Sequence, residues 1–318
     1  MEASIQVVDF QKLSSDQEEL KKLREACEKY GCFRIINHPV PPTLMIDMKL
    51  VAKHLHDLPR DIKKRNKTAI LPDDGYVSLS VTSPVYEGLG IYDMHSSPQE
   101  IQDFFFQLEV SPHDRQIIEA YGQAVHDLAS SVAQKLAGTL GIEDIDFKDW
   151  PFIFRIMRYN FSPETMGSVG AHLHSDTGFI TILQDDETVS GLELVDDSNT
   201  FKTVPPKSGS FFCIIGDVGR AWSNGKFHNV GHRVICKEPN ARYSLGTFML
   251  SPRDGHVEAP PKLVEVDHTQ LYRPFKFKEL EQIKYEDLRK FKVTTGKSTP
   301  QVLDKFLISS DMHGGKHM

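Results

Sequence analysis

Hydrophobic residues in the first half of the chain recur every three or four positions over three stretches. Each stretch opens with a capping residue or a proline, as helices commonly do. The pattern predicts helices over residues 14–30, 42–55 and 112–140, and short strands over residues 5–10 and 32–38. The longest helix carries a continuous apolar stripe, so we expect it to pack along a sheet.

From residue 152 onward the hydrophobic period shortens to two, the period of a β-strand with one buried face. Turn residues, chiefly Gly, Asp, Asn and Pro, separate the runs. The predicted strands occupy residues 152–159, 179–184, 191–195, 210–215, 230–236 and 243–250. A series of short strands like this favours a double-sheet jelly roll or a related barrel.

Residues 69–107 are less periodic and carry several glycines among aromatic residues. A long connection of this kind is typical of a functional loop or lid, although its aromatic residues could equally pack beneath the loop. Tyr76 and Phe104 are its candidate pocket residues. We expect a helical and loop region over residues 1–110, a core with its supporting helix over residues 111–305, and a loose tail over residues 306–318. The first two regions are expected to form one compact unit.

Composition narrows the class of protein. With 318 residues, of which 39% are hydrophobic, the chain can bury a large core, and it lacks the apolar run of roughly 20 residues that a membrane span needs. Four cysteines without a C-x-x-C pair argue against a disulfide framework. A net charge of -7 and a single basic run, at residues 63–67, argue against a nucleic-acid partner. The first residues resemble no signal or transit peptide, so a cytoplasmic protein is expected. We also expect a monomer.

The candidate chemistry lies in His174, Asp176 and His232. On an extended chain residues i and i+2 point the same way, so one imidazole and one carboxylate can bind one metal face while a distant histidine completes the triangle. Two histidines and one carboxylate form the facial triad of non-haem Fe(II) oxygenases, which leaves positions for a chelating co-substrate and O2. The triplet alone is weak evidence, because fourteen histidines produce such spacings by chance.

Arg242 and Ser244 strengthen that interpretation, since they follow His232 by ten and twelve positions. A 2-oxo acid fills two metal positions, and its far carboxylate then needs an anchor. The guanidinium of Arg242 suits bidentate carboxylate recognition, and Ser244 shares its face of a strand. The alternatives are a surface strand, a zinc hydrolase with the same triad, and a non-catalytic sensor. A hydrolase would not need the arginine and serine, and a sensor would not need every ligand intact.

Together these motifs resemble the plant 2-oxoglutarate/Fe(II)-dependent dioxygenases over nearly the whole chain. The resemblance implies a distorted double-stranded β-helix (jelly-roll) core with supporting N-terminal helices. It also implies Fe(II), 2-oxoglutarate and O2 as cofactor and co-substrates, with ascorbate as reductant and no catalytic residue beyond the iron centre. The matching segments are Gly31-Cys32-Phe33, Asn37-His38, His174-Ser175-Asp176, Gly216-Asp217, Ser223-Asn224-Gly225, His232-Arg233-Val234 and Arg242-Tyr243-Ser244.

Within that family the chain is most similar to the dioxygenases for auxin oxidation, through residues 86–94 and 181–187. This narrower resemblance implies a small aromatic substrate, with indole-3-acetic acid oxidised to 2-oxindole-3-acetic acid while succinate and CO2 form. The alternative is hydroxylation or demethylation of another plant specialised metabolite. The core motifs do not report the substrate, because the pocket walls of the family vary.

Strand alternation extends the list of candidate site residues. The family commonly has Asn-Tyr-Tyr-Pro where this chain has Met157-Arg158-Tyr159-Asn160, so we expect Tyr159, with Arg242 and Ser244, to bind 2-oxoglutarate. Arg155 shares the face of Tyr159. An inward arginine needs an anion, which is either the substrate, the co-substrate or a structural carboxylate.

The same alternation beyond Ser244 predicts that Phe248 and Leu250 line the substrate pocket. His172 shares the alternation of His174 but has no counterpart in the usual ligand set. We therefore expect it to support the ligands or to line the pocket.

Overall fold

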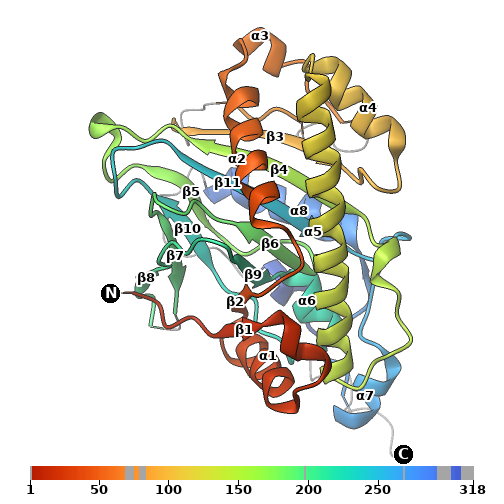
Figure 1. The fold of residues 1–318 in the computed structure, drawn as a ribbon. Helices are drawn as coiled ribbons and strands as arrows, with labels where there is room; N and C mark the ends of the chain where they lie inside the picture. The colour runs from red at the N-terminus through yellow and green to blue at the C-terminus, as the bar shows by residue number, and fades with distance from the viewer. Residues whose placement is uncertain are drawn as a thin grey trace, which may run out of the picture.

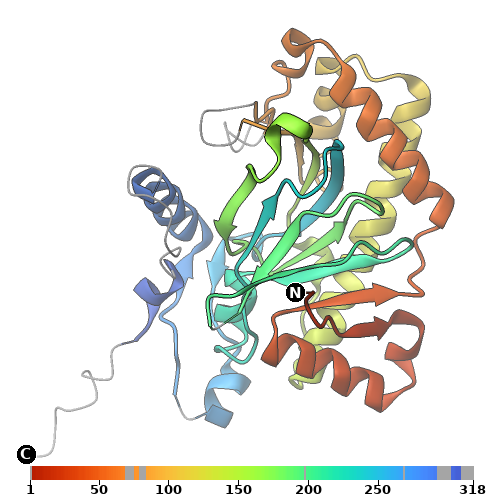
Figure 2. The ribbon, with the colours of Figure 1, turned by 90° about the vertical axis from the view of Figure 1, so that its left-hand side faces the viewer.

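The computed structural model describes residues 2–68, 75–78, 84–196, 198–267, 269–291 and 302–308, and two facing sheets form its centre (Figures 1 and 2). Only β1 and β2 pair in parallel among the strands of these sheets that the structure describes. The larger sheet has the order β1 (Val7–Asp9), β2 (Cys32–Ile36), β9 (Phe211–Ile215), β6 (Ile180–Gln184), β11 (Arg242–Met249), β4 (Phe152–Tyr159), β3 (Tyr86–Tyr92). The smaller has the order β5 (Val169–His174), β10 (His232–Ile235), β7 (Leu192–Val195), β8 (Phe201–Thr203). The double-sheet core is therefore confirmed.

Helices cover the outer face of the larger sheet, as the views from two sides show (Figures 1 and 2). They are α1 (Gln17–Lys29), α2 (Pro42–Asp57) and α5 (Pro112–Thr139), close to the three predicted ranges. The Asp16 carboxylate accepts the first N–H groups of α1, and Gly31 follows its end with φ 66°. That left-handed conformation is costly for residues with a side chain, which explains why the helix ends at this glycine.

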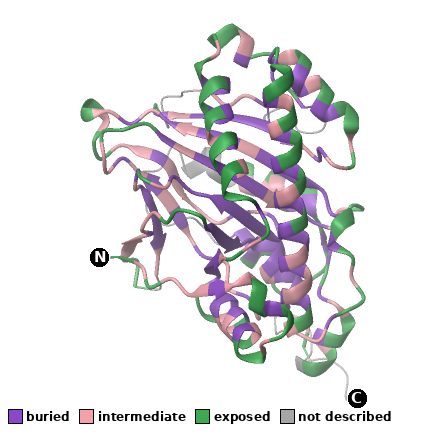
Figure 3. Cartoon of the chain, viewed as in Figure 1, coloured by how far each residue is buried: buried purple, intermediate pink, exposed green. Residues whose placement is uncertain are grey.

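Two separate apolar clusters lie on the two faces of the larger sheet. One fills the space between the sheet and the helices, where one side of α5 is buried along the length of the helix (Figure 3). The other lies between the two sheets and includes Met157, Tyr159, Leu183 and Ile214. Because strand side chains alternate between faces, these residues of β4, β6 and β9 all point into this second cluster. The candidate site lies here.

The prediction of a loop over residues 69–107 is partly wrong. Residues 86–92 form β3 and residues 98–107 form α4 (Pro98–Gln107), while residues 69–74 and 79–83 lie outside the described part. Glycines inside a strand weaken the usual sequence signal. Gly88 leaves room for the Tyr86 side chain, since a Cβ at this position would lie 2.6 Å from the Tyr86 hydroxyl oxygen.

Several short elements were not predicted from the sequence. Besides β5, β8, β12 (His256–Val257) and β13 (Phe275–Lys276), they are α3 (Arg60–Lys63), α6 (Asp217–Trp222), α7 (Pro261–Asp267), α8 (Phe277–Phe291), and 3-10 turns at Phe10–Ser14, Phe147–Asp149, Pro163–Thr165 and Val302–Phe306. Phe306, expected to begin the tail, is instead buried against Phe275. Strands from both sides of residue 110 share the larger sheet.

Within the described residues, no helix has the length and apolar character to cross a bilayer.

Candidate active site

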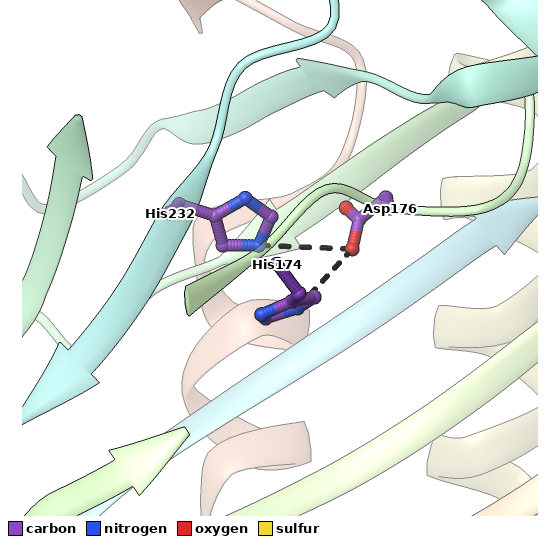
Figure 4. A group of neighbouring side chains, drawn as sticks. All are labelled: His174, Asp176 and His232. Carbon is purple, nitrogen blue, oxygen red and sulfur yellow. Dashed lines mark ion pairs between the residues drawn. The ribbon is translucent and has the colours of Figure 1, made fainter. Parts of the chain in front are cut away.

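His174, Asp176 and His232 converge at the edge of the inter-sheet space (Figure 4). His174 is the last residue of β5 and His232 the first of β10, and the two are direct partners in the antiparallel register. Asp176 lies beyond the end of β5. The extended geometry assumed for His174 and Asp176 therefore ends at His174. The register between two strands, rather than one continuous strand, brings the ligand atoms together.

The three side chains present one lone-pair atom each toward a common point. The Nε2 atoms of His174 and His232 each lie 3.6 Å from Oδ1 of Asp176. The opposite ring nitrogens contact backbone carbonyls, with Nδ1 of His174 at 2.7 Å from the His172 oxygen and Nδ1 of His232 at 3.3 Å from the Val230 oxygen. Carbonyls only accept, so each Nδ1 carries the proton and each Nε2 is free to bind a metal.

The charge states also suit a divalent ion. Burial and the neighbouring His232 ring lower the pKa of His174 to about 4. Burial opposes ionisation of Asp176, but the two imidazoles and a hydrogen bond of 2.5 Å from the Thr181 hydroxyl hold the pKa of its carboxyl below the ordinary value. A neutral imidazole and an ionised carboxylate are the forms that bind metal. The residues therefore fit a ferrous ion with three protein ligands and open positions.

A cavity of about 240 Å³ opens from this triad into the space between the sheets. Its walls come from β3, β4, β5, β6, β7, β9, β10 and β11 and are mostly apolar. The lining residues are Tyr86, Arg155, Met157, Tyr159, Ala171, His174, Asp176, Thr181, Leu183, Leu192, Ile214, His232, Val234, Arg242, Ser244 and Phe248. A mostly apolar cavity with a few convergent polar groups is typical of a small-molecule site.

One part of the cavity fits a carboxylate. Arg242 is 1% exposed, begins β11 beside Tyr159 of β4, and lies with its guanidinium carbon 5.0 Å from the Tyr159 ring centre. Its Nη2 donates to the carboxylate of Asp185, whereas Nε and Nη1 have no hydrogen-bond partner within the described residues. Buried N–H groups without a partner are costly, so these donors fit an acceptor such as the far carboxylate of 2-oxoglutarate.

A second guanidinium lines the same cavity. Arg155 of β4 stands between two glycines, Gly90 of β3 and Gly246 of β11, in the pairing register. A Cβ on Gly246 would lie 2.6 Å from the Phe248 ring, so that ring lies over the glycine. Arg155, Met157 and Phe248 thus form one wall, and the alternation predicted for β4 and for β11 as far as Phe248 is observed.

The structure does not bring Leu250, Phe104 or Tyr76 to the cavity. Strand β11 ends at Met249, so the alternation stops, and Leu250 is buried in the helix-side cluster. Phe104 belongs to the same cluster because α4 turns it toward the core. The Tyr76 hydroxyl donates to Glu87 at 2.5 Å in a separate charged cluster. His172 contributes its carbonyl to His174 and is not among the cavity walls.

Three polar residues at the site were missed by sequence reasoning. Thr181 lies in β6 on the same face as Leu183, a signal that strand parity could have supplied, and Asp185 follows directly after the strand. No sequence pattern pointed to Lys284 of α8, because it is 109 positions from its acceptor, Ser175. Its ammonium group donates to the Ser175 carbonyl at 2.8 Å and to Asp217 at 2.6 Å, and the Asp217 N–H donates to the Asp176 carbonyl at 2.8 Å. Lys284 therefore holds the turn between two of the candidate ligands.

Two family models match the chain. The model of the 2OG-Fe(II) oxygenase superfamily matches residues 152–251, and the model described as non-haem dioxygenase in morphine synthesis, N-terminal, matches residues 5–120. The first span runs from β4 through β11 and so contains the triad together with Arg242 and Ser244. The second contains α1 and α2 and ends within α5.

Curated proteins and solved structures agree with these matches. The 2-oxoglutarate-dependent dioxygenase DAO of Oryza sativa subsp. japonica is 42% identical over 90% of this chain and 92% of its own length. The crystal structure of the dioxygenase for auxin oxidation in rice is similar with a TM-score of 0.82, at 40% identity, over 96% of this chain and 100% of that chain. The dioxygenase for auxin oxidation 1 from Arabidopsis thaliana, in complex with 2-oxoglutarate, has a TM-score of 0.78 at 44% identity over 83% and 99%.

Proposed function

The chain belongs to the 2OG-Fe(II) oxygenase superfamily, and from this premise we propose that it oxidises a small aromatic carboxylic acid, with indole-3-acetic acid as the leading substrate and 2-oxindole-3-acetic acid as the product. The enzyme is a 2-oxoglutarate-dependent dioxygenase, an oxidoreductase that uses Fe(II). When bound, Fe(II) supplies the O2 activation that couples oxidation of the substrate to conversion of 2-oxoglutarate into succinate and CO2.

The residues of the cavity have different binding roles. His174, Asp176 and His232 would hold the iron. Arg242, Ser244 and Tyr159 would hold the far carboxylate of 2-oxoglutarate and so fix the orientation of the co-substrate. A mostly apolar cavity keeps bulk water from the reacting groups, which limits turnover without substrate. The protein contributes binding, orientation and exclusion of water.

One observation carries the substrate class: a second arginine, Arg155, lines the cavity and pairs in register with Gly246, over which the ring of Phe248 lies. The two carboxylates of 2-oxoglutarate are already assigned, one to the metal and one to Arg242. We assign Arg155 to the carboxylate of the organic substrate and Phe248 to its aromatic ring. The rice relative is a dioxygenase for auxin oxidation, which agrees with this assignment.

The test of the reaction offers the reconstituted Fe(II) enzyme a panel of indole and phenolic acids. Each acid is mixed anaerobically with 2-oxoglutarate and ascorbate and then exposed to air, and succinate and oxidised product are quantified. Indole-3-acetic acid should give equal amounts of succinate and 2-oxindole-3-acetic acid. Succinate no higher than the background without substrate would remove this acid as the leading choice, and a different acid giving coupled product would replace it.

The role of Arg155 is tested by Arg155→Met, which keeps much of the side-chain length and removes the charge. Loss of a charge-assisted hydrogen bond costs about 1.5–3 kcal/mol, so KM for indole-3-acetic acid should rise about 10- to 100-fold. The neutral analogue indole-3-acetamide is the control, because its binding should change little in the variant. An unchanged KM for the acid would show that Arg155 does not anchor it.

A further inference from the structure

Asp185 places a carboxylate of the protein itself against Arg242, the arginine at the co-substrate end of the cavity. It follows directly after β6, whose inward residues Thr181 and Leu183 line the cavity. Its side chain is buried, and its Oδ1 accepts from Nη2 of Arg242, 57 positions away. The carboxylate therefore lies on the guanidinium that is assigned to 2-oxoglutarate.

The neighbouring acid, Asp186, has a different task. Its Oδ1 accepts the N–H groups of Thr188 and Val189 and contacts Lys49 at 3.2 Å, while its Oδ2 accepts the Tyr243 N–H. These contacts close the turn after β6 and join it to β11. Asp186 thus holds the turn to β11, whereas Asp185 accepts the Asp186 N–H at 2.9 Å and pairs with the charge of Arg242.

A second buried arginine near Asp185 shows why Arg242 is the group concerned. Arg34 of β2 donates through Nη1 to the Ser210 hydroxyl at 3.0 Å and through Nη2 to the Pro205 carbonyl at 2.8 Å. Both terminal nitrogens of Arg34 therefore donate to groups of the protein itself. Arg242, by contrast, keeps Nε and Nη1 without a partner in the described part of the chain.

The charge balance of this end of the cavity changes when the co-substrate binds. A fully buried guanidinium without a counter-ion is strongly destabilising, so before binding Asp185 supplies the negative charge that Arg242 needs. When the carboxylate of 2-oxoglutarate arrives, two anions share one cation. Like charges in close proximity oppose each other, so each carboxylate weakens the hold of the other.

We propose that Asp185 is a resident counter-ion of Arg242, which stabilises the protein before co-substrate binding and lowers its affinity for 2-oxoglutarate. The inference rests on the co-substrate role proposed above for Arg242. Asp185 is a positioning residue in this scheme, because it acts on the co-substrate through the guanidinium. Its presence sets the concentration of 2-oxoglutarate at which the enzyme becomes saturated.

The decisive variant is Asp185→Asn, which keeps the shape and an oxygen acceptor for Nη2 but removes the charge. A neighbouring like charge is worth at least about one pKa unit, so KM and Kd for 2-oxoglutarate should fall about tenfold. The thermal unfolding midpoint without co-substrate should fall, and its rise on adding 2-oxoglutarate should grow. A KM for 2-oxoglutarate that is unchanged or raised would overturn the proposal.

Two controls make the result specific. Binding of 2-oxobutyrate, which lacks the far carboxylate, should be the same in Asp185→Asn and in the unmodified enzyme. Asp186→Asn removes an adjacent charge that acts on Arg242 through space without a hydrogen bond to it and that is paired with Lys49, so it should lower KM for 2-oxoglutarate less than Asp185→Asn does. If 2-oxobutyrate binding tightens equally, the effect is not exerted at the far carboxylate and the proposal fails.

A variant that folds poorly is also informative. If Asp185→Asn, or the smaller Asp185→Ser, is unstable when purified alone, addition of Fe(II) and 2-oxoglutarate should restore it, because the co-substrate supplies the missing anion. Failure of this rescue contradicts the counter-ion role. Failure of the proposed function is distinguished by Arg242→Met: if that variant retains its affinity for 2-oxoglutarate, the assignment of Arg242 is wrong whatever Asp185 does.

Discussion

Replacing Thr181 by valine tests how far the surroundings of the triad prepare it for iron. The Thr181 hydroxyl donates to Oδ2 of Asp176 at 2.5 Å, and both side chains are buried. This bond engages the second carboxylate oxygen and leaves Oδ1, 3.6 Å from both imidazole nitrogens, as the oxygen that would bind a metal. Valine keeps the β-branched shape that β6 requires and removes only the hydroxyl.

The expected size of the effect follows from two independent estimates. A hydrogen bond to a charged group contributes about 1.5–3 kcal/mol. Loss of a partner that orients a metal ligand commonly lowers metal affinity about 10- to 100-fold, which corresponds to about 1.4–2.8 kcal/mol. The two ranges agree, so we expect Kd for Fe(II) to rise about 10- to 100-fold in Thr181→Val, while activity at saturating iron largely recovers.

The assay is an anaerobic titration of the metal-free enzyme with Fe(II) in the presence of 2-oxoglutarate, followed by the charge-transfer absorption of the complex. Thr139→Val is the matched control, because its hydroxyl donates to the Leu136 carbonyl at the end of α5, far from the site. Equal iron affinity in Thr181→Val and the unmodified enzyme would refute the argument that this bond prepares Asp176.

Two further predictions follow from charged side chains outside the cavity walls. Lys284→Met should raise Kd for Fe(II) about tenfold, since it releases the turn between His174 and Asp176, and Lys284→Arg should restore part of the affinity in the same titration. An equal change in the exposed control Lys276→Met would contradict it. Burial opposes ionisation of Glu87, but its bonds to Tyr76, Lys63 and Arg158 lower the pKa of its carboxyl from 4.5 to about 2. The ionised Glu87 stabilises the folded state fully above pH 4.5, and this stabilisation is lost as the pH falls toward about 2. Glu87→Gln should therefore lower the thermal unfolding midpoint more at neutral pH than in acid. An equal lowering at all pH values would contradict the prediction.

The site that alternation predicted is largely the site that is observed, within the limits of each strand. Tyr159, Met157 and Arg155 share one face of β4, and Arg242, Ser244 and Phe248 share one face of β11. The prediction failed at Leu250 because alternation holds only while the chain stays extended, and β11 ends one residue earlier. It failed at Phe104 because a stretch rich in aromatic residues was interpreted as a loop, although α4 turns Phe104 into the helix-side core.

The sequence by itself determined the kinds of element, the faces of the strands and the chemistry of the ligands, because period, capping and residue type are local properties. Tertiary structure alone decided which faces meet. The register that pairs His174 with His232, the contact of Asp185 with Arg242 across 57 positions, and the reach of Lys284 across 109 positions all depend on packing between distant segments. Such contacts form only when burial of the two apolar clusters brings the sheets and helices together, and no local pattern in the sequence encodes them.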